Sequence, residues 1–373
     1  MRQVIHPLLS PSLGTQRQLA SLHFGQATNG RKAYIQSSLH ADELPGMLVA
    51  HELRGLLGAA EARGEIPGEV VLVPVCNPIG LDQGLMHHQV GRFELLGMEN
   101  FNRNYPDFFK LVKDRIASQL TQDAEANKAL VRAAMREALD EQSASTELDS
   151  LRHTLMRLSC DADVVLDLHC DFEAALHMYV EEPMLSQMMP LAQLLGVRAL
   201  LWARGSGPSI SFDEALSGPW WRLQEHFAGT APIPLACAST TVELRGQTDV
   251  SGELAKQDAA AILGYLRHAG VLSGPAPALP AARCEPTPLT GTEALHAPHP
   301  GVVDFTVRPG DLVKAGQLLA RLVDPLTPRE TDVRSGIDGV VYARHNHRWA
   351  TTGMELCRVA GKKPIRSGNL LSP

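Results

Sequence analysis

Apolar side chains recur along roughly the first 270 residues in two alternating rhythms, as short runs typical of strands and as longer segments with helical spacing. The strand-like runs are 16–24, 32–38, 69–74, 164–168, 198–203 and 239–244, and the helical segments are 45–62, 108–158, 183–195, 220–227 and 252–268. A strand, a helix and a strand in succession predict a parallel pair joined by a crossover. The pattern therefore predicts an α/β domain whose mixed, mostly parallel sheet is flanked by helices.

Breaks and turns divide this pattern further. A turn is predicted at Ala27-Thr28-Asn29-Gly30, and Ser143-Ala144-Ser145 is expected to interrupt the long helical segment. The apolar run 174–180 is expected to lie beside the strand 164–168 as its neighbour, since the two are close in sequence.

The composition changes after residue 272. Residues 273–290 carry five prolines and are predicted to form an extended linker. Beyond this linker, a G-V-V run follows a glycine turn at 301–303 and again at 339–341, a near-repeat typical of a small all-β module. The predicted organisation is an α/β domain at 1–272, a linker at 273–290 and a β domain at 291–373.

Overall composition excludes several classes of protein. The chain of 373 residues is 44% hydrophobic and has a net charge of -7. This balance gives no electrostatic case for nucleic-acid binding. The six cysteines are scattered without a C-x-x-C motif, which fits a reducing compartment. No run approaches the roughly 18 apolar residues of a membrane span, and no signal-peptide pattern opens the chain. We expect a soluble, cytoplasmic protein without a membrane partner.

A candidate metal site arises where two predicted strands end. His40 and Glu43 lie between a strand and a helix, and the strand 164–168 runs into His169. Open α/β sheets bind ligands at the carboxyl ends of their strands. Two imidazoles and one carboxylate form the three-ligand set of a catalytic zinc site. Taken alone, His40 and Glu43 are better explained by helix capping and the helix dipole, and it is the second strand ending at His169 that favours a metal site.

Residues 80–107 are predicted to form a polar loop directly after a strand. Its donor-rich side chains are those of His87, His88, Arg92, Asn100, Asn102, Arg103 and Asn104. Such a loop is a candidate for substrate recognition, and solvated loop arginines are the alternative. Glu243 lies in T-V-E-L near the end of the strand 239–244, and by itself it is better explained as an ordinary carboxylate paired with Arg245 than as a catalytic one.

Four motifs stand in an order that resembles the succinylglutamate desuccinylase/aspartoacylase family, a branch of the zinc carboxypeptidase superfamily: His40-x-x-Glu43, Asn102-Arg103, a strand ending at His169, and Glu243 in T-V-E-L. The resemblance extends over about residues 33–268. It implies a zinc carboxypeptidase-like fold with one zinc per chain, held by His40, Glu43 and His169.

The resemblance also implies roles around this zinc. Glu243 would be the general base, because a carboxylate beside a zinc-activated water can take its proton and return it to the leaving amine. Asn102 and Arg103 would hold a substrate carboxylate, and Arg92 would polarise the scissile carbonyl. Asp167 is expected to orient His169 from outside the ligand set.

Asp42 lies between two of the implied ligands, and its carboxylate could compete with Glu43 for the metal. The family pattern favours Glu43 as the ligand.

The C-terminal module resembles the biotinyl/lipoyl barrel-sandwich, through its repeated glycine turns and P-G-D-L-V-K-A-G-Q at 309–317. Such modules carry a prosthetic group on a lysine in the hairpin between their halves. Here that hairpin is expected at 324–331, which has no lysine, and Lys314 lies in an earlier turn. We therefore expect no attached biotin or lipoyl group. In the family, the C-terminal domain lies beside the active-site mouth and limits substrate size.

The leading hypothesis is a zinc-dependent amidohydrolase of amino-acid metabolism that removes an acetyl or succinyl group from an amino acid or a related small carboxylate. Ester hydrolysis is a variant of the same chemistry. The alternatives are a metallocarboxypeptidase-type peptidase and a non-catalytic metal-binding or carrier-like protein. The sequence leaves open whether the chain forms a homo-oligomer.

Overall fold

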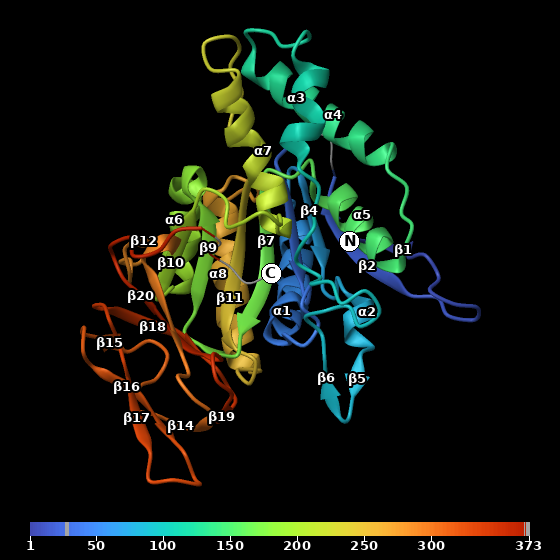
Figure 1. Ribbon diagram of the computed structural model, residues 1–373. Helices are drawn as coiled ribbons and strands as arrows, with labels where there is room; N and C mark the ends of the chain where they lie inside the picture. The colour runs from blue at the N-terminus through green and yellow to red at the C-terminus, as the bar shows by residue number, and fades with distance from the viewer. Residues whose placement is uncertain (27–29, 369, 371–373) are drawn as a thin grey trace.

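The structure is a computed structural model that describes residues 1–26, 30–368 and 370. Within these residues, a nine-stranded sheet runs through the larger part of the chain (Figure 1). In spatial order its strands are β1 (Arg2–Pro7), β2 (Gln18–Gly25), β4 (Glu69–Val73), β3 (Lys32–Ser37), β7 (Val164–Asp171), β11 (Ala238–Gly246), β9 (His177–Glu181), β10 (Ala199–Ala203) and β12 (Pro286–Pro288).

The middle of this sheet is parallel. β4, β3, β7 and β11 run in one direction, and β9, β10 and β12 form a second parallel group that meets β11 antiparallel. The edge strands β1 and β2 are antiparallel. A mixed, mostly parallel sheet, with β3 and β4 as a parallel pair across a helix, is therefore confirmed.

One expected neighbour is wrong. The run 174–180 does not pair with β7, because β11 lies between β7 and β9 and uses the hydrogen-bonding groups of both. Residues 173–174 instead form the separate strand β8 (Glu173–Ala174). The turn expected at Ala27-Thr28-Asn29-Gly30 falls on residues 27–29, which lie outside the described residues.

Helices cover both faces of the sheet. On one face α1 (Pro45–Ala62) packs on α8 (Gly252–His268), which packs on α6 (Leu185–Leu195). Gly46 of α1 lies against Leu168 on this face. On the other face Phe212, the first residue of α7 (Phe212–His226), packs on Tyr34, which pairs with Val165. Since 165 and 168 point to opposite faces of β7, the odd-numbered positions of β7 face α7.

The helical segment expected at 108–158 is three helices, α3 (Phe108–Ile116), α4 (Ala124–Asp140) and α5 (Glu147–Ser159). The break at Ser143-Ala144-Ser145 is confirmed, and a second break precedes Asp123, whose carboxylate accepts backbone N–H groups at the start of α4. The helix expected at 220–227 begins earlier, at Phe212, because Ser211 and Glu214 cap it. Short elements are α2 (Pro78–Leu81), β5 (Gly84–Leu85), β6 (His88–Gln89), η1 (Glu182–Met184) and η2 (Leu289–Gly291).

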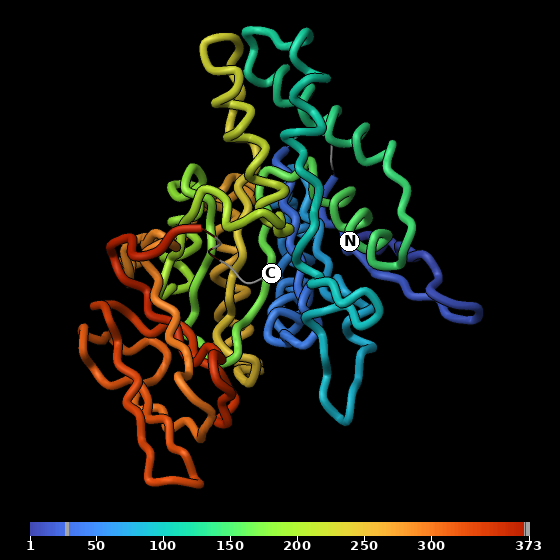
Figure 2. Tube along the Cα trace, in the orientation of Figure 1, coloured from blue at the N-terminus to red at the C-terminus, as the bar shows by residue number. Residues whose placement is uncertain are grey.

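The C-terminal residues form two antiparallel sheets with a hydrophobic core of their own, beside the main sheet in Figures 1 and 2. One contains β13 (Thr292–His296), β20 (Glu355–Ala360), β18 (Gly339–Arg344) and β15 (Leu312–Val313). The other contains β17 (Glu330–Arg334), β16 (Leu318–Val323), β14 (Gly301–Phe305) and β19 (Trp349–Ala350).

Two strand pairings among the described residues join this C-terminal part to the larger domain. The proline-rich segment adds β12 to the edge of the main sheet beside β10, and β8 pairs with β18. No helix among the described residues has the length and apolar character that crossing a membrane requires.

Candidate metal centre

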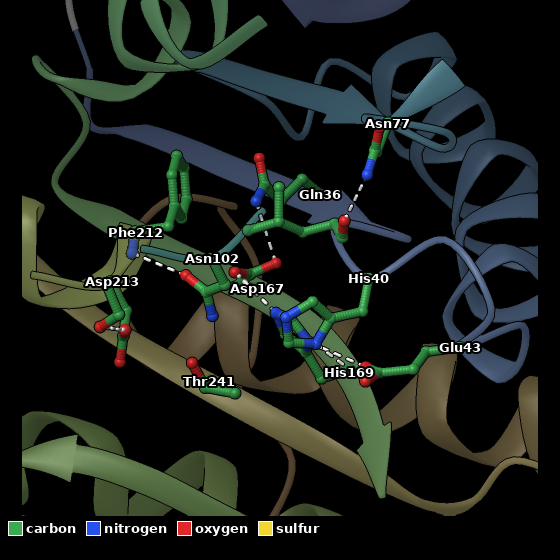
Figure 3. A network of polar contacts seen from close by, with 12 residues as sticks. Gln36, His40, Glu43, Asn77, Asn102, Asp167, His169, Phe212, Asp213 and Thr241 are labelled. Carbon is green, nitrogen blue, oxygen red and sulfur yellow. Dashed lines mark hydrogen bonds and ion pairs between the residues drawn. The ribbon is translucent and has the colours of Figure 1, made fainter. Parts of the chain in front are cut away.

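The three predicted ligands come together at the carboxyl ends of β3 and β7. These strands are parallel neighbours, so the loop after β3, which carries His40 and Glu43, lies beside His169 on β7 (Figure 3). All three side chains are buried. One potential ligand atom from each lies within 4.8 Å of the others. The packing of two adjacent strands therefore unites residues that are far apart in sequence.

Glu43 lies between the two imidazoles. Its Oε1 is 2.9 Å from Nδ1 of His40, and its Oε2 is 2.8 Å from Nδ1 of His169. The backbone N–H of Cys170 donates to the same Oε2 at 3.0 Å. Both imidazoles thus direct Nδ1 toward one point, which is the arrangement that a shared cation requires.

The other ring nitrogens face oxygen acceptors. Nε2 of His40 is 2.9 Å from Oδ1 of Asn100, and Nε2 of His169 is 2.9 Å from Oδ2 of Asp167. The Gln36 amide donates to Asp167 Oδ1 at 3.0 Å and orients that carboxylate. An acceptor on Nε2 favours the proton there and leaves the Nδ1 lone pair for a metal. Asp167 lies at ion-pair distance from His169 without the alignment of a hydrogen bond, so its expected orienting role stays a prediction.

The charges of the triad depend on one another. Burial acts to raise the pKa of Glu43, but the two imidazoles outweigh it and hold that pKa well below its usual value. Burial acts to lower the pKa of His169, but Asp167 and Glu43 outweigh it and raise that pKa well above the usual value. Burial, with the Arg92 guanidinium, lowers the pKa of His40 to about 4. The pocket therefore keeps Glu43 as an anion beside positive charge.

Glu243 lies next to the triad on β11, where it pairs in register with His169. Its Oε2 is buried without a hydrogen-bond partner among the described residues. Burial and the charge of Glu43 raise the pKa of Glu243 to about 8. The alternative of a pair with Arg245 does not hold, because Arg245 binds Asp258 on α8 at 2.7 and 3.0 Å.

The predicted recognition residues of the polar loop also reach this place. The Arg92 guanidinium lies 3.6 Å from Glu43 Oε1 and 3.4 Å from His40 Nδ1. The backbone N–H of Phe212 donates to Asn102 Oδ1 at 2.8 Å, which fixes the amide of Asn102. Arg103 is buried and donates to the carbonyl oxygen of Asn102 at 2.7 Å.

A cavity of about 420 Å³ contains these groups. The predicted residues on its lining are His40, Arg92, Asn102, Arg103, His169 and Glu243. Asp42 does not line it, and its carboxylate accepts from Gln247 at 3.0 Å, away from the triad. His87 and His88 are exposed around the β5–β6 turn and do not line it either.

Several lining residues escape prediction from sequence. They are Glu181 at the end of β9, Asp213 on α7, Thr241 on β11, and Arg344 and Arg358 from the C-terminal part. Thr241 precedes Glu243 by two residues, so the strand alternation places both on one face. The others carry no local motif, because their approach to the cavity depends on long-range packing.

Comparison with known proteins agrees with this geometry. A sequence model described as the succinylglutamate desuccinylase/aspartoacylase catalytic domain matches residues 29–269. No curated protein sequence matches the chain.

Solved structures share the fold over nearly the whole chain. A crystal structure from Shewanella amazonensis, assigned to the succinylglutamate desuccinylase/aspartoacylase family, is 26% identical with a TM-score of 0.85 and covers 97% of this chain and 99% of its own. One from Shewanella frigidimarina is 24% identical with a TM-score of 0.85, over 96% and 97%. The ectoine utilization protein EutE (DoeB) of Ruegeria pomeroyi is 15% identical with a TM-score of 0.66, over 96% and 95%. The chain belongs to the succinylglutamate desuccinylase/aspartoacylase family.

Proposed function

We propose that this protein is a zinc-dependent deacylase that removes an acetyl- or succinyl-type group from an amino acid or a related small carboxylate. The observation that carries the proposal is a buried His-Glu-His triad beside a carboxylate that has no hydrogen-bond partner among the described residues. The triad is His40, Glu43 and His169, and the carboxylate is Glu243. Family membership supports hydrolysis of an amide bond.

The residues of the triad fit one zinc ion per chain. Two imidazoles and one carboxylate are the donors of many catalytic zinc sites, and they leave a coordination position for water or substrate. The triad is buried, its Nδ1 atoms face one carboxylate, and Asn100 and Asp167 support its imidazoles. Zinc bound there supplies Lewis-acid chemistry, which lowers the pKa of water and polarises a carbonyl oxygen.

The protein's own groups supply the proton transfers. We assign Glu243 as the general base that accepts the proton of the attacking water and then donates it to the leaving nitrogen. A raised pKa makes the Glu243 carboxylate a stronger base toward the attacking water, and the carboxylic acid that forms can then donate to the leaving nitrogen. Arg92, beside the triad, is assigned to the carbonyl oxygen that gains negative charge.

Binding of the substrate carboxylate is assigned to Asn102 and Arg103. A guanidinium and an amide N–H can bind both oxygens of a carboxylate. The hydrogen bond from Phe212 leaves the Asn102 amide nitrogen directed into the cavity (Figure 3). Asn102-Arg103 is also one of the four motifs in which the sequence resembles the family.

We infer a division into a hydrolase domain at 1–272, a linker at 273–290 and a barrel-sandwich-like β domain at 291–373. Six residues of the C-terminal part line the cavity: Ala343, Arg344, His345, Met354, Glu355 and Arg358. Because the C-terminal part contributes to the cavity wall, it limits the space there, and this favours small substrates over the peptide chain that a carboxypeptidase binds. Six cysteines without a disulfide among them support a reducing, cytoplasmic location.

The experiment that tests this function uses zinc-loaded protein and a panel of N-acetyl and N-succinyl amino acids. Glu243→Gln should retain one zinc per chain but lower kcat by about 100-fold or more, because it removes proton transfer. Glu253→Gln, an exposed glutamate on α8, is the matched control and should keep native turnover. Native turnover in Glu243→Gln contradicts the assigned base, and a chain that binds no zinc contradicts the proposal.

A further inference from the structure

One part of the cavity wall is acidic, namely the part that α7 and the end of β9 form. Glu181, Asp213 and Glu214 all line it, and Glu181 and Asp213 are only 6% and 7% exposed. Gly218 of α7 brings its backbone close to Glu181, since a Cβ added there would lie 3.5 Å from both carboxylate oxygens. The mechanism proposed above uses none of these carboxylates.

Only neutral groups of the described residues contact Glu181. The Ser217 hydroxyl donates to one of its oxygens at 2.7 Å, and the Trp221 indole N–H donates to the other at 3.0 Å. No described lysine or arginine forms an ion pair with Glu181. A buried carboxylate without a cation is costly unless it becomes neutral or gains a charged partner.

Asp213 is also short of donors. Its Oδ1 accepts from the Ser211 hydroxyl at 2.6 Å, but that hydroxyl is also 3.0 Å from Glu214 and has a single proton to give. Both oxygens of Glu214 act in the helix cap, because they accept from the backbone N–H groups of Ser206 and Ser211. Glu214 therefore adds negative charge to the wall, while Glu181 and Asp213 can bind a ligand.

An independent observation is that two further polar groups are directed into the same space without a partner among the described residues. Thr241 is only 7% exposed, lines the cavity, and its hydroxyl makes no hydrogen bond. The amide nitrogen of Asn102 is likewise free of a partner, while its oxygen is held by Phe212. In Figure 3 the Thr241 hydroxyl and the Asn102 amide lie near the Asp213 carboxylate.

We propose that Glu181, Asp213 and Thr241 bind a free ammonium group of the substrate, which makes the substrate an N-acyl diamino acid. An ammonium ion has three donors and no acceptor, and two carboxylates and a hydroxyl can receive them. This inference rests on the proposed deacylase function and narrows its substrate class. Asn102 and Arg103 would bind the carboxylate, so that the cavity recognises both charges of a zwitterion.

The test compares substrates that differ only in the ammonium group. The pairs are Nα-acetyl-lysine with Nα-acetyl-norleucine, and Nε-acetyl-lysine with 6-acetamidohexanoate. The native enzyme should favour the cationic member of at least one pair by about tenfold or more in kcat/KM, because a charge-assisted hydrogen bond is lost with the other. Asp213→Asn and Glu181→Gln should reduce this ratio, while turnover of the uncharged member is kept. Equal kcat/KM within both pairs overturns the proposal.

The matched control is Glu182→Gln, which removes a negative charge next to Glu181 but from an exposed pair with Arg204. It should leave the ratio unchanged. Thr241→Val is a milder variant, since it removes only the hydroxyl, and zinc content and thermal melting report whether each variant folds. An unchanged ratio in folded Asp213→Asn and Glu181→Gln also overturns the proposal.

A binding measurement without turnover tests the ammonium site independently of the proposed deacylase function. Calorimetric titration of zinc-loaded protein with lysine and with norleucine needs no turnover. Tighter binding of lysine, weakened in Glu181→Gln or Asp213→Asn, supports the ammonium site even if no acyl amino acid is hydrolysed. Lysine that binds no more tightly than norleucine overturns it.

Discussion

Asn100 and Asp167 lie beside the Nε2 atoms of the two candidate histidine ligands. Each places an oxygen 2.9 Å from Nε2 of its imidazole, so that Nδ1 of His40 and of His169 turns toward Glu43. A carboxylate in this position also makes the imidazole a stronger donor to a metal. We therefore expect these two residues to raise the zinc affinity of the triad without contacting the metal.

Replacing Asp167 with asparagine tests this support. Asp167→Asn keeps the shape of the side chain but removes its charge, so zinc affinity should fall by about tenfold or more, measured by competition with a chelator. Asp42→Asn is the control, because Asp42 lies beside the triad in sequence but binds Gln247. Equal zinc affinity of Asp167→Asn and the native protein would contradict the supporting role.

Motifs predict residues only where function requires them close together in sequence. The pairs His40 with Glu43 and Asn102 with Arg103 each lie in one loop; the first pair clusters with His169, and the second lines the cavity. Asp213 and Glu181 have no such signal, because each reaches the cavity through the packing of α7 on β9. An isolated acidic residue in sequence is far more often exposed than buried.

Among the elements, α1 sets the position of the metal loop. Its first turn follows Glu43 directly, and Gly46 lets its backbone approach Ser37 and Leu168 at the ends of β3 and β7. A Cβ on Gly46 would lie 2.9 Å from Ser37 Cβ and 3.0 Å from the Leu168 carbonyl oxygen. That close packing fixes the helix next to the residue that precedes His169.

Two glycines of this helix give a matched pair. Gly46→Ala should lower stability by about 1–3 kcal/mol through overpacking and should also weaken zinc binding. Gly55→Ala meets no atom within 4 Å and should raise stability by up to about 1 kcal/mol, because alanine favours the helix. Thermal melting with and without zinc measures both. A Gly46→Ala protein as stable as the native one would show that α1 can shift without cost.

The boundaries of a helix were predictable where residues at its ends signal them, such as a proline in the first turn or a capping serine. The helices expected at 45–62 and 252–268 have these bounds in the structure, with Pro45 in the first turn of one and Ser251 capping the other. β1 was not expected, because its alternation is weak and its side chains are largely exposed at the sheet edge. Edge strands bury too little apolar surface to leave a clear pattern.

At the scale of the whole molecule, the C-terminal part completes the cavity. Strand β8, which follows β7 in sequence, pairs with β18, and Arg358 of β20 donates to Asp171 of β7 at 3.2 Å. Asp171 lies two residues after His169. The contact between the two parts of the chain therefore lies directly beside the metal centre.

Removing this ion pair should affect both stability and binding. Arg358→Met leaves Asp171 without its partner, so the free energy of unfolding should fall by about 1–3 kcal/mol and KM should rise. Arg321→Met is the control, because Arg321 lies on β16 in an exposed pair with Asp332 that contributes about 1 kcal/mol at most. Urea unfolding and steady-state kinetics measure these effects. Similar unfolding midpoints for the two variants would contradict a structural role of the Arg358 contact.

Local sequence was sufficient to determine the α/β class and the two helices that flank the candidate site, and it brought out the types of residue that we propose as metal ligands. These properties follow from hydrophobic periodicity, caps and donor chemistry, which act over a few neighbouring residues. Only the tertiary structure decided that β11 lies between β7 and β9, that Glu243 therefore faces His169, and that C-terminal residues close the cavity. Strand order depends on long-range pairing and packing, and no short stretch of sequence records which partners are chosen.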